Sequence, residues 1–217
     1  KTFGFGVPLL DRVFDDADIA PPDGTPRALI VVPTRELAQQ VTADLQDAAA
    51  HLPVRLAAIY GGRPYEEQIK LLQRGVDVVI GTPGRLLDLH ERGDLVLRHV
   101  AIVVLDEADE MLDLGFLPSI EATLEALDGN AHQTMLFSAT MPGAILNLSR
   151  QFMNKPVHIR AESEADEITH ETTRKVTFQA HRMDKVAVIA HILQAQGRGR
   201  SIIFTRTKRS AAQLADD

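Results

Sequence analysis

Short apolar runs alternate along the chain with longer segments in which apolar residues recur every three or four positions. Most of the short runs lack polar alternation, which is typical of parallel strands covered on both faces. The longer segments have the period of amphipathic helices; in residues 36–52, Leu37, Val41 and Leu45 fall on one helical face. This succession of strand, helix and strand predicts an α/β domain with a mostly parallel sheet.

The same pattern gives bounds for the elements. Strands are predicted at residues 28–32, 56–60, 76–80, 100–105, 134–137 and 201–204. Helices are predicted at residues 3–10, 36–52, 64–73, 117–127, 143–153 and 184–194. Residues 15–26 contain four aspartates and three prolines, and are expected to form an exposed acidic loop.

Composition excludes several classes of protein. The 30 acidic residues outnumber the 23 basic ones, so a polyanion must bind at a local basic patch rather than through bulk positive charge. The absence of cysteine excludes disulfide scaffolds, thiolate zinc sites and cysteine nucleophiles. The longest uninterrupted apolar run, residues 100–105, is too short to span a bilayer, so no membrane partner is expected.

A polar segment with five acidic residues, 162–173, interrupts the α/β pattern. We therefore predict a first domain over residues 1–160, a linker over 161–174, and the beginning of a second domain over 175–217. The chain starts without methionine and stops inside a segment of helical composition. These two ends lead us to expect a fragment of a longer protein.

Nearly every predicted strand runs directly into a polar cluster. Ligands of open parallel sheets bind beyond the carboxyl ends of the strands, so these clusters predict one shared functional face. The five clusters are Pro33-Thr34-Arg35-Glu36, Gly61-Gly62-Arg63, Gly81-Thr82-Pro83-Gly84-Arg85, Asp106-Glu107-Ala108-Asp109 and Ser138-Ala139-Thr140.

Asp106 and Glu107 are the strongest candidates for chemistry. A carboxylate after a buried strand can hold a magnesium ion on nucleotide phosphates, and its neighbour can deprotonate an attacking water. The alternative is a polar turn before a helix, where the helix dipole favours acids. Phosphate-binding loops end in Lys-Thr or Lys-Ser, and the chain opens with Lys1-Thr2. Two residues alone are no motif, and taken by themselves they are better explained by an arbitrary chain start.

Together and in this order, six segments resemble the DEAD-box RNA helicases: PTRELA (33–38), GG (61–62), TPGR (82–85), DEAD (106–109), SAT (138–140) and IIFTRTK (202–208). The resemblance runs across essentially the whole chain. It implies a RecA-like three-layer sandwich followed by the start of a second RecA-like domain. It also implies a cytoplasmic enzyme that couples ATP hydrolysis, with Mg²⁺, to unwinding or remodelling of RNA duplexes.

The resemblance implies a role for each matching residue. Lys1 and Thr2 bind the ATP phosphates, and Thr2 and Asp106 hold the magnesium ion. Glu107 is the catalytic base, and Asp109 links the nucleotide site to movement of the two lobes, together with Ser138 and Thr140. Contacts to the backbone of one RNA strand are implied for Pro33, Thr34, Arg35, Glu36, Gly61, Gly62, Thr82, Pro83, Gly84, Arg85, Thr205 and Arg206.

The residue types in these segments also suit binding to the phosphate backbone of RNA rather than to its bases. Glycines allow a phosphate to approach the chain closely, and Arg35 and Arg85 supply local positive charge. Aromatic residues make up only 5% of the chain, so base stacking cannot be the main source of affinity. Little sequence specificity is therefore expected.

Several family segments are absent from these 217 residues. Upstream these are the phosphate-loop glycines, the strand before them and the adenine-reading glutamine motif, and downstream the second-lobe arginines that reach ATP. By itself the chain is therefore expected to be nearly inactive. Two alternatives to a helicase are a non-catalytic ATP-dependent RNA clamp and a DNA-directed translocase of the same superfamily. Retention of Glu107 argues against the clamp.

Overall fold

The computed structural model describes residues 1–127, 131–160, 176–197 and 199–216. The chain divides into two compact units, Lys1–His158 and Ile159–Asp217. The predicted linker, 161–174, lies outside the described residues, so the predicted domain bounds stay a prediction.

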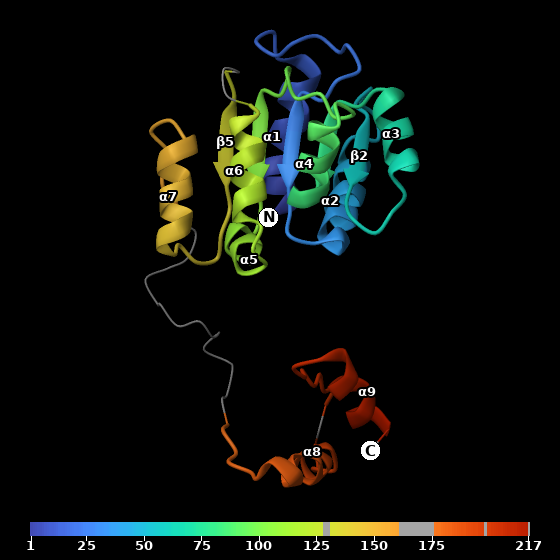
Figure 1. Ribbon diagram of the computed structural model, residues 1–217, viewed down its shortest axis with the longest axis vertical. Helices are drawn as coiled ribbons and strands as arrows, with labels where there is room; N and C mark the ends of the chain where they lie inside the picture. The colour runs from blue at the N-terminus through green and yellow to red at the C-terminus, as the bar shows by residue number, and fades with distance from the viewer. Residues whose placement is uncertain (128–130, 161–175, 198, 217) are drawn as a thin grey trace. The chain divides into compact units, whose positions relative to one another are not determined.

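The first unit is built on a five-stranded sheet with the order β2-β3-β1-β4-β5 (Figure 1). All four strand pairings are parallel, which confirms the predicted α/β class. The strands are β1 (Ala28–Val31), β2 (Leu56–Ile59), β3 (Val78–Gly81), β4 (Ile102–Leu105) and β5 (Gln133–Leu136).

Seven helices of this unit connect and flank the strands. They are α1 (Thr2–Asp15), α2 (Arg35–Ala48), α3 (Tyr65–Gln73), α4 (Pro83–Glu91), α5 (Ala108–Asp113), α6 (Leu117–Glu125) and α7 (Gly143–Phe152). Each predicted helix of this unit is present, with ends that differ by a few residues. The helix predicted from residue 3 extends to Asp15.

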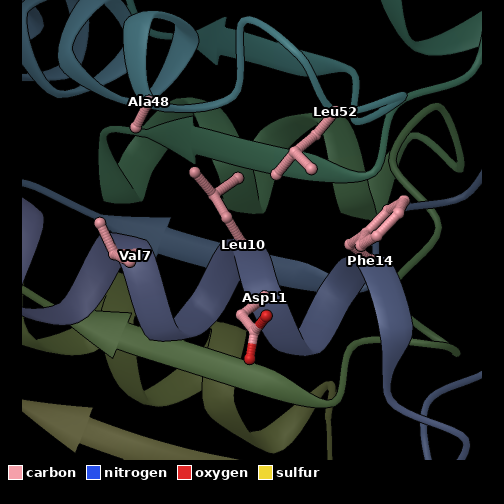
Figure 2. A pocket seen from close by; sticks show the side chains of 6 residues that line it. All are labelled: Val7, Leu10, Asp11, Phe14, Ala48 and Leu52. Carbon is pink, nitrogen blue, oxygen red and sulfur yellow. The ribbon is translucent and has the colours of Figure 1, made fainter.

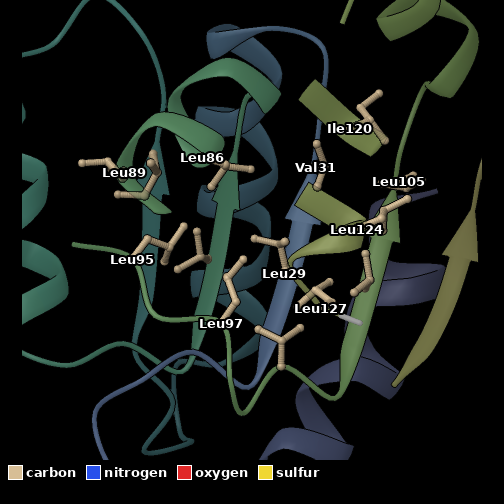
Figure 3. Close-up of a cluster of buried hydrophobic side chains, with 14 of the residues drawn as sticks. Leu29, Val31, Leu86, Leu89, Leu95, Leu97, Leu105, Ile120, Leu124 and Leu127 are labelled. Carbon is tan, nitrogen blue, oxygen red and sulfur yellow. The ribbon is translucent and has the colours of Figure 1, made fainter. Parts of the chain in front are cut away.

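The sheet separates two hydrophobic clusters, which gives the unit three layers. Along β1, Leu29 and Val31 belong to one cluster, whereas Ala28 and Ile30 belong to the other. The first cluster includes side chains of α4 and α6, and Figure 3 shows several of them around Leu29 and Val31. The second includes side chains of α1 and α2. Burial on both faces explains the apolar, non-alternating strand sequences, each large side chain contributing about 1.5–3 kcal/mol.

Each predicted strand of the first unit differs from the structure by one or two residues at one or both ends. β3 and β4 begin two residues later than expected: the Val76 N–H donates to the Gly24 carbonyl rather than to a neighbouring strand, and the Val100 N–H donates to the Leu97 carbonyl in a turn. The predicted strand at 201–204 is wrong. A strand needs a hydrogen-bonded neighbour, and the described residues of the second unit contain no other strand.

The described part of the second unit consists of η1 (Arg182–Asp184), α8 (Lys185–Leu193) and α9 (Lys208–Asp216). Neither α8 nor α9 has a buried side chain among its described residues. Large apolar residues such as Ile202 and Phe204 are exposed. Nothing in these described residues therefore forms a hydrophobic core.

A shallow groove lies between α1 and α2 on one side of the sheet (Figure 2). Its walls are mainly apolar and come from Val7, Leu10, Asp11, Phe14, Ala48 and Leu52. The polar clusters that follow the strands lie elsewhere, at the carboxyl ends of the strands.

Candidate nucleotide and RNA site

The carboxyl ends of the five strands meet at one edge of the sheet. The last residue of β1, Val31, is in register with Gly81 of β3 and with Leu105 of β4, and Leu105 is in register with Leu136 of β5. Ile59 of β2 is in register with Gly81. The polar residues that follow these positions therefore begin at the same height along the strand direction, at the carboxyl end of the sheet.

Lys1, Asp106 and Glu107 come together just beyond β4. The Lys1 ammonium lies 2.7 Å from Asp106 Oδ1 and 3.5 Å from Glu107 Oε1. The Asp106 side chain is 1% exposed, and its Oδ1 also accepts a hydrogen bond from the Glu107 N–H at 2.9 Å. The other oxygen, Oδ2, is buried and has no hydrogen-bond partner among the described residues. A buried carboxylate oxygen without a partner is available to a ligand.

The two carboxylates also affect the charge of Lys1. Partial burial of its ammonium acts to lower the pKa of Lys1, but the hydrogen bond that Lys1 donates to Asp106 and the charges of Asp106 and Glu107 outweigh burial and raise it. The Lys1 side chain is therefore protonated and positively charged at neutral pH. Its side chain is 45% exposed, so it can also meet an anionic ligand.

Glu107 has an unusual backbone. Its φ of 55° and ψ of 52° lie in the left-handed region, at the residue that precedes α5. The following N–H, of Ala108, donates to the carbonyl of Phe137 at the end of β5. Non-glycine residues in this region cost about 1–2 kcal/mol and concentrate at functional sites. The Glu107 side chain is 43% exposed beside Lys1.

Asp109 connects α5 to the segment after β5. Its Oδ2 accepts hydrogen bonds from the Thr140 N–H at 2.9 Å and the Thr140 hydroxyl at 2.8 Å. The Asp109 N–H donates to Ser138 Oγ at 3.2 Å, and that hydroxyl donates to the Thr140 carbonyl at 2.6 Å. The structure thus brings together the three residues of the predicted coupling group.

This network favours the ionised form of Asp109. Partial burial acts to raise its pKa, but the hydrogen bonds from Thr140 and Ser138 prevail and hold the pKa of Asp109 below its ordinary value. The link between the two segments is therefore charge-assisted at neutral pH.

The first two predicted RNA segments lie next to each other. Thr34 caps α2, its hydroxyl accepting from the Leu37 N–H at 3.2 Å. Arg35 and Glu36 are exposed and form an ion pair at 2.6 Å. A β-carbon added at Gly62, where φ is +84°, would lie 3.7 Å from Arg35 Nη1. The segment after β1 and the glycines after β2 thus share one surface.

The third RNA segment begins α4. Thr82 is buried and precedes the helix, Pro83 takes its first position, and a β-carbon added at the exposed Gly84 would meet nothing within 4 Å. Arg85 Nη1 donates to the Arg63 carbonyl at 3.0 Å, which joins this segment to the glycine loop after β2.

Three further side chains on this edge, Tyr60, Tyr65 and Arg92, were not among the predicted site residues. Arg85 Cζ lies 4.0 Å from the ring centroid of Tyr65, and Arg92 Cζ lies 4.7 Å from the same centroid. Arg63 Cζ lies 5.3 Å from the Tyr60 ring centroid. Arg92 caps α4 seven residues after Arg85, so helical spacing could have placed the two arginines on the same side. The neighbouring Tyr65 ring, on α3, left no signal in the sequence.

Fewer contacts are seen for the remaining predicted site residues, Thr2, Thr205 and Arg206. Thr2 is the first residue of α1, next to Lys1. Thr205 Oγ1 donates to the Thr207 carbonyl at 3.0 Å in the second unit, and Arg206 is exposed there. Over the residues described, no group of three or more His, Asp or Glu side chains is arranged as a metal site. No helix in the described ranges is long and apolar enough to cross a membrane.

The chain is similar to two curated helicases over nearly its whole length. It is 40% identical over 216 residues to the DEAD-box ATP-dependent RNA helicase CshA of Geobacillus kaustophilus, covering 100% of this chain and 44% of the relative. It is also 40% identical over 216 residues to DEAD-box ATP-dependent RNA helicase 9 of Oryza sativa subsp. japonica, covering 99% and 34%. The chain thus spans less than half the length of these relatives.

The chain is also similar to solved structures of helicases of this kind. A DEAD box protein from the hyperthermophile Methanococcus jannaschii matches with a TM-score of 0.68 and 34% identity, over 99% of this chain and 55% of that one. A hypothetical ATP-dependent RNA helicase from Sulfolobus tokodaii matches with a TM-score of 0.62 and 36% identity, over 71% and 42%. The family model of the DEAD/DEAH box helicases matches residues 1–148. The six sequence motifs, the parallel sheet and these matches together establish that the chain belongs to the DEAD/DEAH box helicase family.

Proposed function

We propose that the intact protein is an ATP-dependent RNA helicase that hydrolyses ATP and uses the cycle to unwind or remodel RNA duplexes. The observation that supports this best is the convergence of Lys1, Asp106 and Glu107 within 3.5 Å beyond β4. One cation and two carboxylates at the end of a parallel strand suit the binding and cleavage of a nucleoside triphosphate.

The residues present fit a magnesium ion. Asp106 offers a buried oxygen without a partner, and oxygen donors are the ligands that Mg²⁺ prefers. Asp106, with Thr2, would hold the ion together with water and phosphate oxygens. When bound, the ion supplies charge neutralisation on the transferring phosphoryl group.

The chain's own residues then have separate tasks in hydrolysis. Lys1 binds phosphate oxygens and thereby leaves Asp106. Glu107 accepts a proton from the water whose oxygen attacks the γ-phosphorus. The bond between that phosphorus and the β–γ bridging oxygen breaks, and ADP leaves with the electron pair. The exposure of Glu107 beside Lys1 suits this position.

RNA binding and coupling involve the other motif residues. Arg35, Arg85 and the exposed glycines line the edge where a phosphodiester backbone would lie. The Asp109–Ser138–Thr140 network joins the carboxylate loop to the segment after β5, and so is placed to relay the nucleotide state. Thr205 and Arg206 contribute from the second lobe in this proposal, and a cytoplasmic location follows from the resemblance.

The decisive experiment compares Glu107→Gln with Asp106→Asn in the intact protein. Glu107→Gln keeps the shape of the side chain but cannot accept a proton, so we expect ATP and RNA affinity to persist while single-turnover hydrolysis falls about 10²- to 10⁴-fold. Asp106→Asn removes the buried charge, so magnesium-dependent nucleotide affinity is expected to fall as well.

A helix-capping role for these acids would give a small loss of stability and unchanged turnover. Hydrolysis by Glu107→Gln at the normal rate would therefore refute the assignment. Measuring ATPase stimulation by RNA and by DNA of equal length tests the substrate: stimulation by DNA alone would exclude an RNA helicase.

A further inference from the structure

Two arginine side chains share one aromatic ring at the edge of the RNA-facing surface. The guanidinium carbons of Arg85 and Arg92 lie 4.0 and 4.7 Å from the ring centroid of Tyr65, within the range of cation–π contacts. The Tyr65 hydroxyl donates to the Asp88 carboxylate. This hydrogen bond joins α3 to α4, while the ring itself contacts the two guanidinium groups.

The spacing along α4 makes this arrangement possible. Arg85 and Asp88 lie three residues apart on α4, and Arg92 caps its carboxyl end four residues after Asp88, so the three side chains lie on one side of this segment. At 1.5 Å per residue, the backbone of Arg92 lies about 10 Å farther along the helix than that of Arg85. The cluster therefore extends positive charge from the strand ends along α4.

The guanidinium of Arg85 retains unused donors. In the described part of the chain no carboxylate lies within salt-bridge distance of Arg85, and its hydrogen bond to the Arg63 carbonyl uses one nitrogen. Arg92 Nε donates to Asp94 at 3.1 Å, in a pair whose arginine side chain is 50% exposed. A guanidinium has five N–H donors, so both side chains can still bind a phosphate in a bidentate manner.

Simple packing of α3 on α4 does not account for the second arginine. The two contact distances limit the separation of the guanidinium carbons to about 9 Å, which is close to the screening length of about 8 Å in physiological salt. Two like charges at this separation still repel each other weakly, and a bound polyanion offsets that repulsion. A phosphodiester backbone is the anion that the adjacent motif residues already favour.

We propose that Tyr65, Arg85 and Arg92 form one binding unit for the RNA backbone, in which Tyr65 is a positioning residue and Arg92 a second phosphate contact outside the motifs. This inference rests on the proposed function, because it assumes that RNA lies along this edge.

The test measures the affinity of the intact protein for a short fluorescein-labelled oligouridylate across a salt series. Arg92→Gln is expected to weaken binding about three- to tenfold and to make the log–log salt slope less negative by about 0.7, one phosphate contact on single-stranded RNA. Tyr65→Leu removes the ring under both guanidinium groups and is expected to reduce the slope at least as much. Tyr65→Phe keeps the ring, so its affinity should stay within about twofold.

Arg98→Gln is the matched control, because Arg98 is an exposed arginine that pairs with Asp23 ahead of the amino end of β4. Its salt slope is expected to equal that of the unsubstituted protein. An unchanged slope in both Arg92→Gln and Tyr65→Leu would overturn the inference, even if Tyr65→Leu lowers the melting temperature. If Arg85→Ala nevertheless weakens binding, the proposed function stands; if it also has no effect, the RNA-binding edge itself is wrong.

Discussion

At the scale of single residues, Glu107 combines a strained backbone with the proposed role of catalytic base. Its left-handed conformation begins α5 directly after the buried Asp106. A glycine would adopt this conformation without the steric cost that a β-carbon imposes. The glutamate therefore lowers the stability of the fold at this position, but it supplies the carboxylate that the proposed reaction needs.

We expect Glu107→Gly to raise the free energy of unfolding by up to about 1 kcal/mol. Relief of the left-handed strain is worth about 1–2 kcal/mol, of which the greater freedom of unfolded glycine removes about 0.5–1 kcal/mol. Urea denaturation of the chain measures the difference. Glu107→Gln keeps the β-carbon and serves as the control, with an expected change within about 0.5 kcal/mol. A Glu107→Gly variant less stable than Glu107→Gln would contradict the strain.

The hydrogen bonds to Asp109 make the stability of the first unit sensitive to acid. The pKa of Asp109 is lowered in the folded state, so its contribution is fully present above the ordinary value of 3.8 and is lost as the pH falls through the folded value. We expect Asp109→Asn to be less stable than the unsubstituted chain at pH 7. This difference should shrink as the pH falls below about 4.

Unfolding by urea at a series of pH values checks this expectation. Asp113→Asn is the control, because Asp113 is exposed on the same helix and its side chain has no hydrogen bond or ion pair among the described residues. A stability difference for Asp109→Asn that does not vary with pH would mean that ionisation of Asp109 does not support the network.

At the scale of elements, two glycines three residues apart have opposite surroundings. A β-carbon at Gly81, the last residue of β3, would lie 2.4 Å from the Ile59 carbonyl oxygen and 2.8 Å from Leu86 Cδ2. A β-carbon at Gly84, near the start of α4, would have no neighbour within 4 Å. Gly81 thus serves sheet packing, whereas the open space at Gly84 is left for a ligand.

We expect Gly81→Ala to lose about 1–3 kcal/mol of stability, because the β2 carbonyl cannot move without disturbing the sheet. Gly84→Ala should keep or gain stability, by up to about 1 kcal/mol, since alanine favours a helix. It should nevertheless weaken RNA binding, because the added methyl group occupies the phosphate approach. Thermal melting and RNA titration separate the two effects. Unchanged RNA affinity in Gly84→Ala would exclude a close backbone contact there.

Most of the first unit could be predicted from the sequence because its signals are local. Apolar runs such as 28–32 identify strands buried on both faces, and polar residues such as Asp106 mark the strand ends. Since all pairings are parallel, the strand ends had to converge, which brought Asp109 and Thr140 together as expected.

Other features depend on contacts that no local pattern specifies. The left-handed turn at Glu107 falls on a residue type that gives no sign of it, and Tyr65 meets Arg85 and Arg92 only because α3 packs beside α4. The segment 201–204 has a strand-like composition, but composition cannot supply a neighbouring strand.

At the scale of the whole molecule, the proposed RNA binding would have to overcome the net charge of −7 that these 217 residues carry. Arginines such as Arg35 and Arg85 concentrate positive charge at one edge of the sheet. We expect the log–log salt slope of RNA binding to be near −3, from about four phosphate contacts at about −0.7 each. Single strands of equal length and different base sequence should bind the intact protein with similar affinity. Fluorescence titrations with several such strands check both expectations, and a flat salt response with strong base preference would contradict them.

The order β2-β3-β1-β4-β5 also determines when the partners of the central strand become available during synthesis. The neighbours of β1 are β3 and β4, which follow it along the chain. A ribosome that adds roughly 5–20 residues per second takes several seconds to proceed from β1 to β4. β3 is synthesised within that interval, so the apolar segment Ala28–Val31 can pair with β3 first and lacks its second partner until β4 follows. One side of the central strand therefore stays unpaired, and open to a chaperone, until the strand that precedes the DEAD segment has been synthesised.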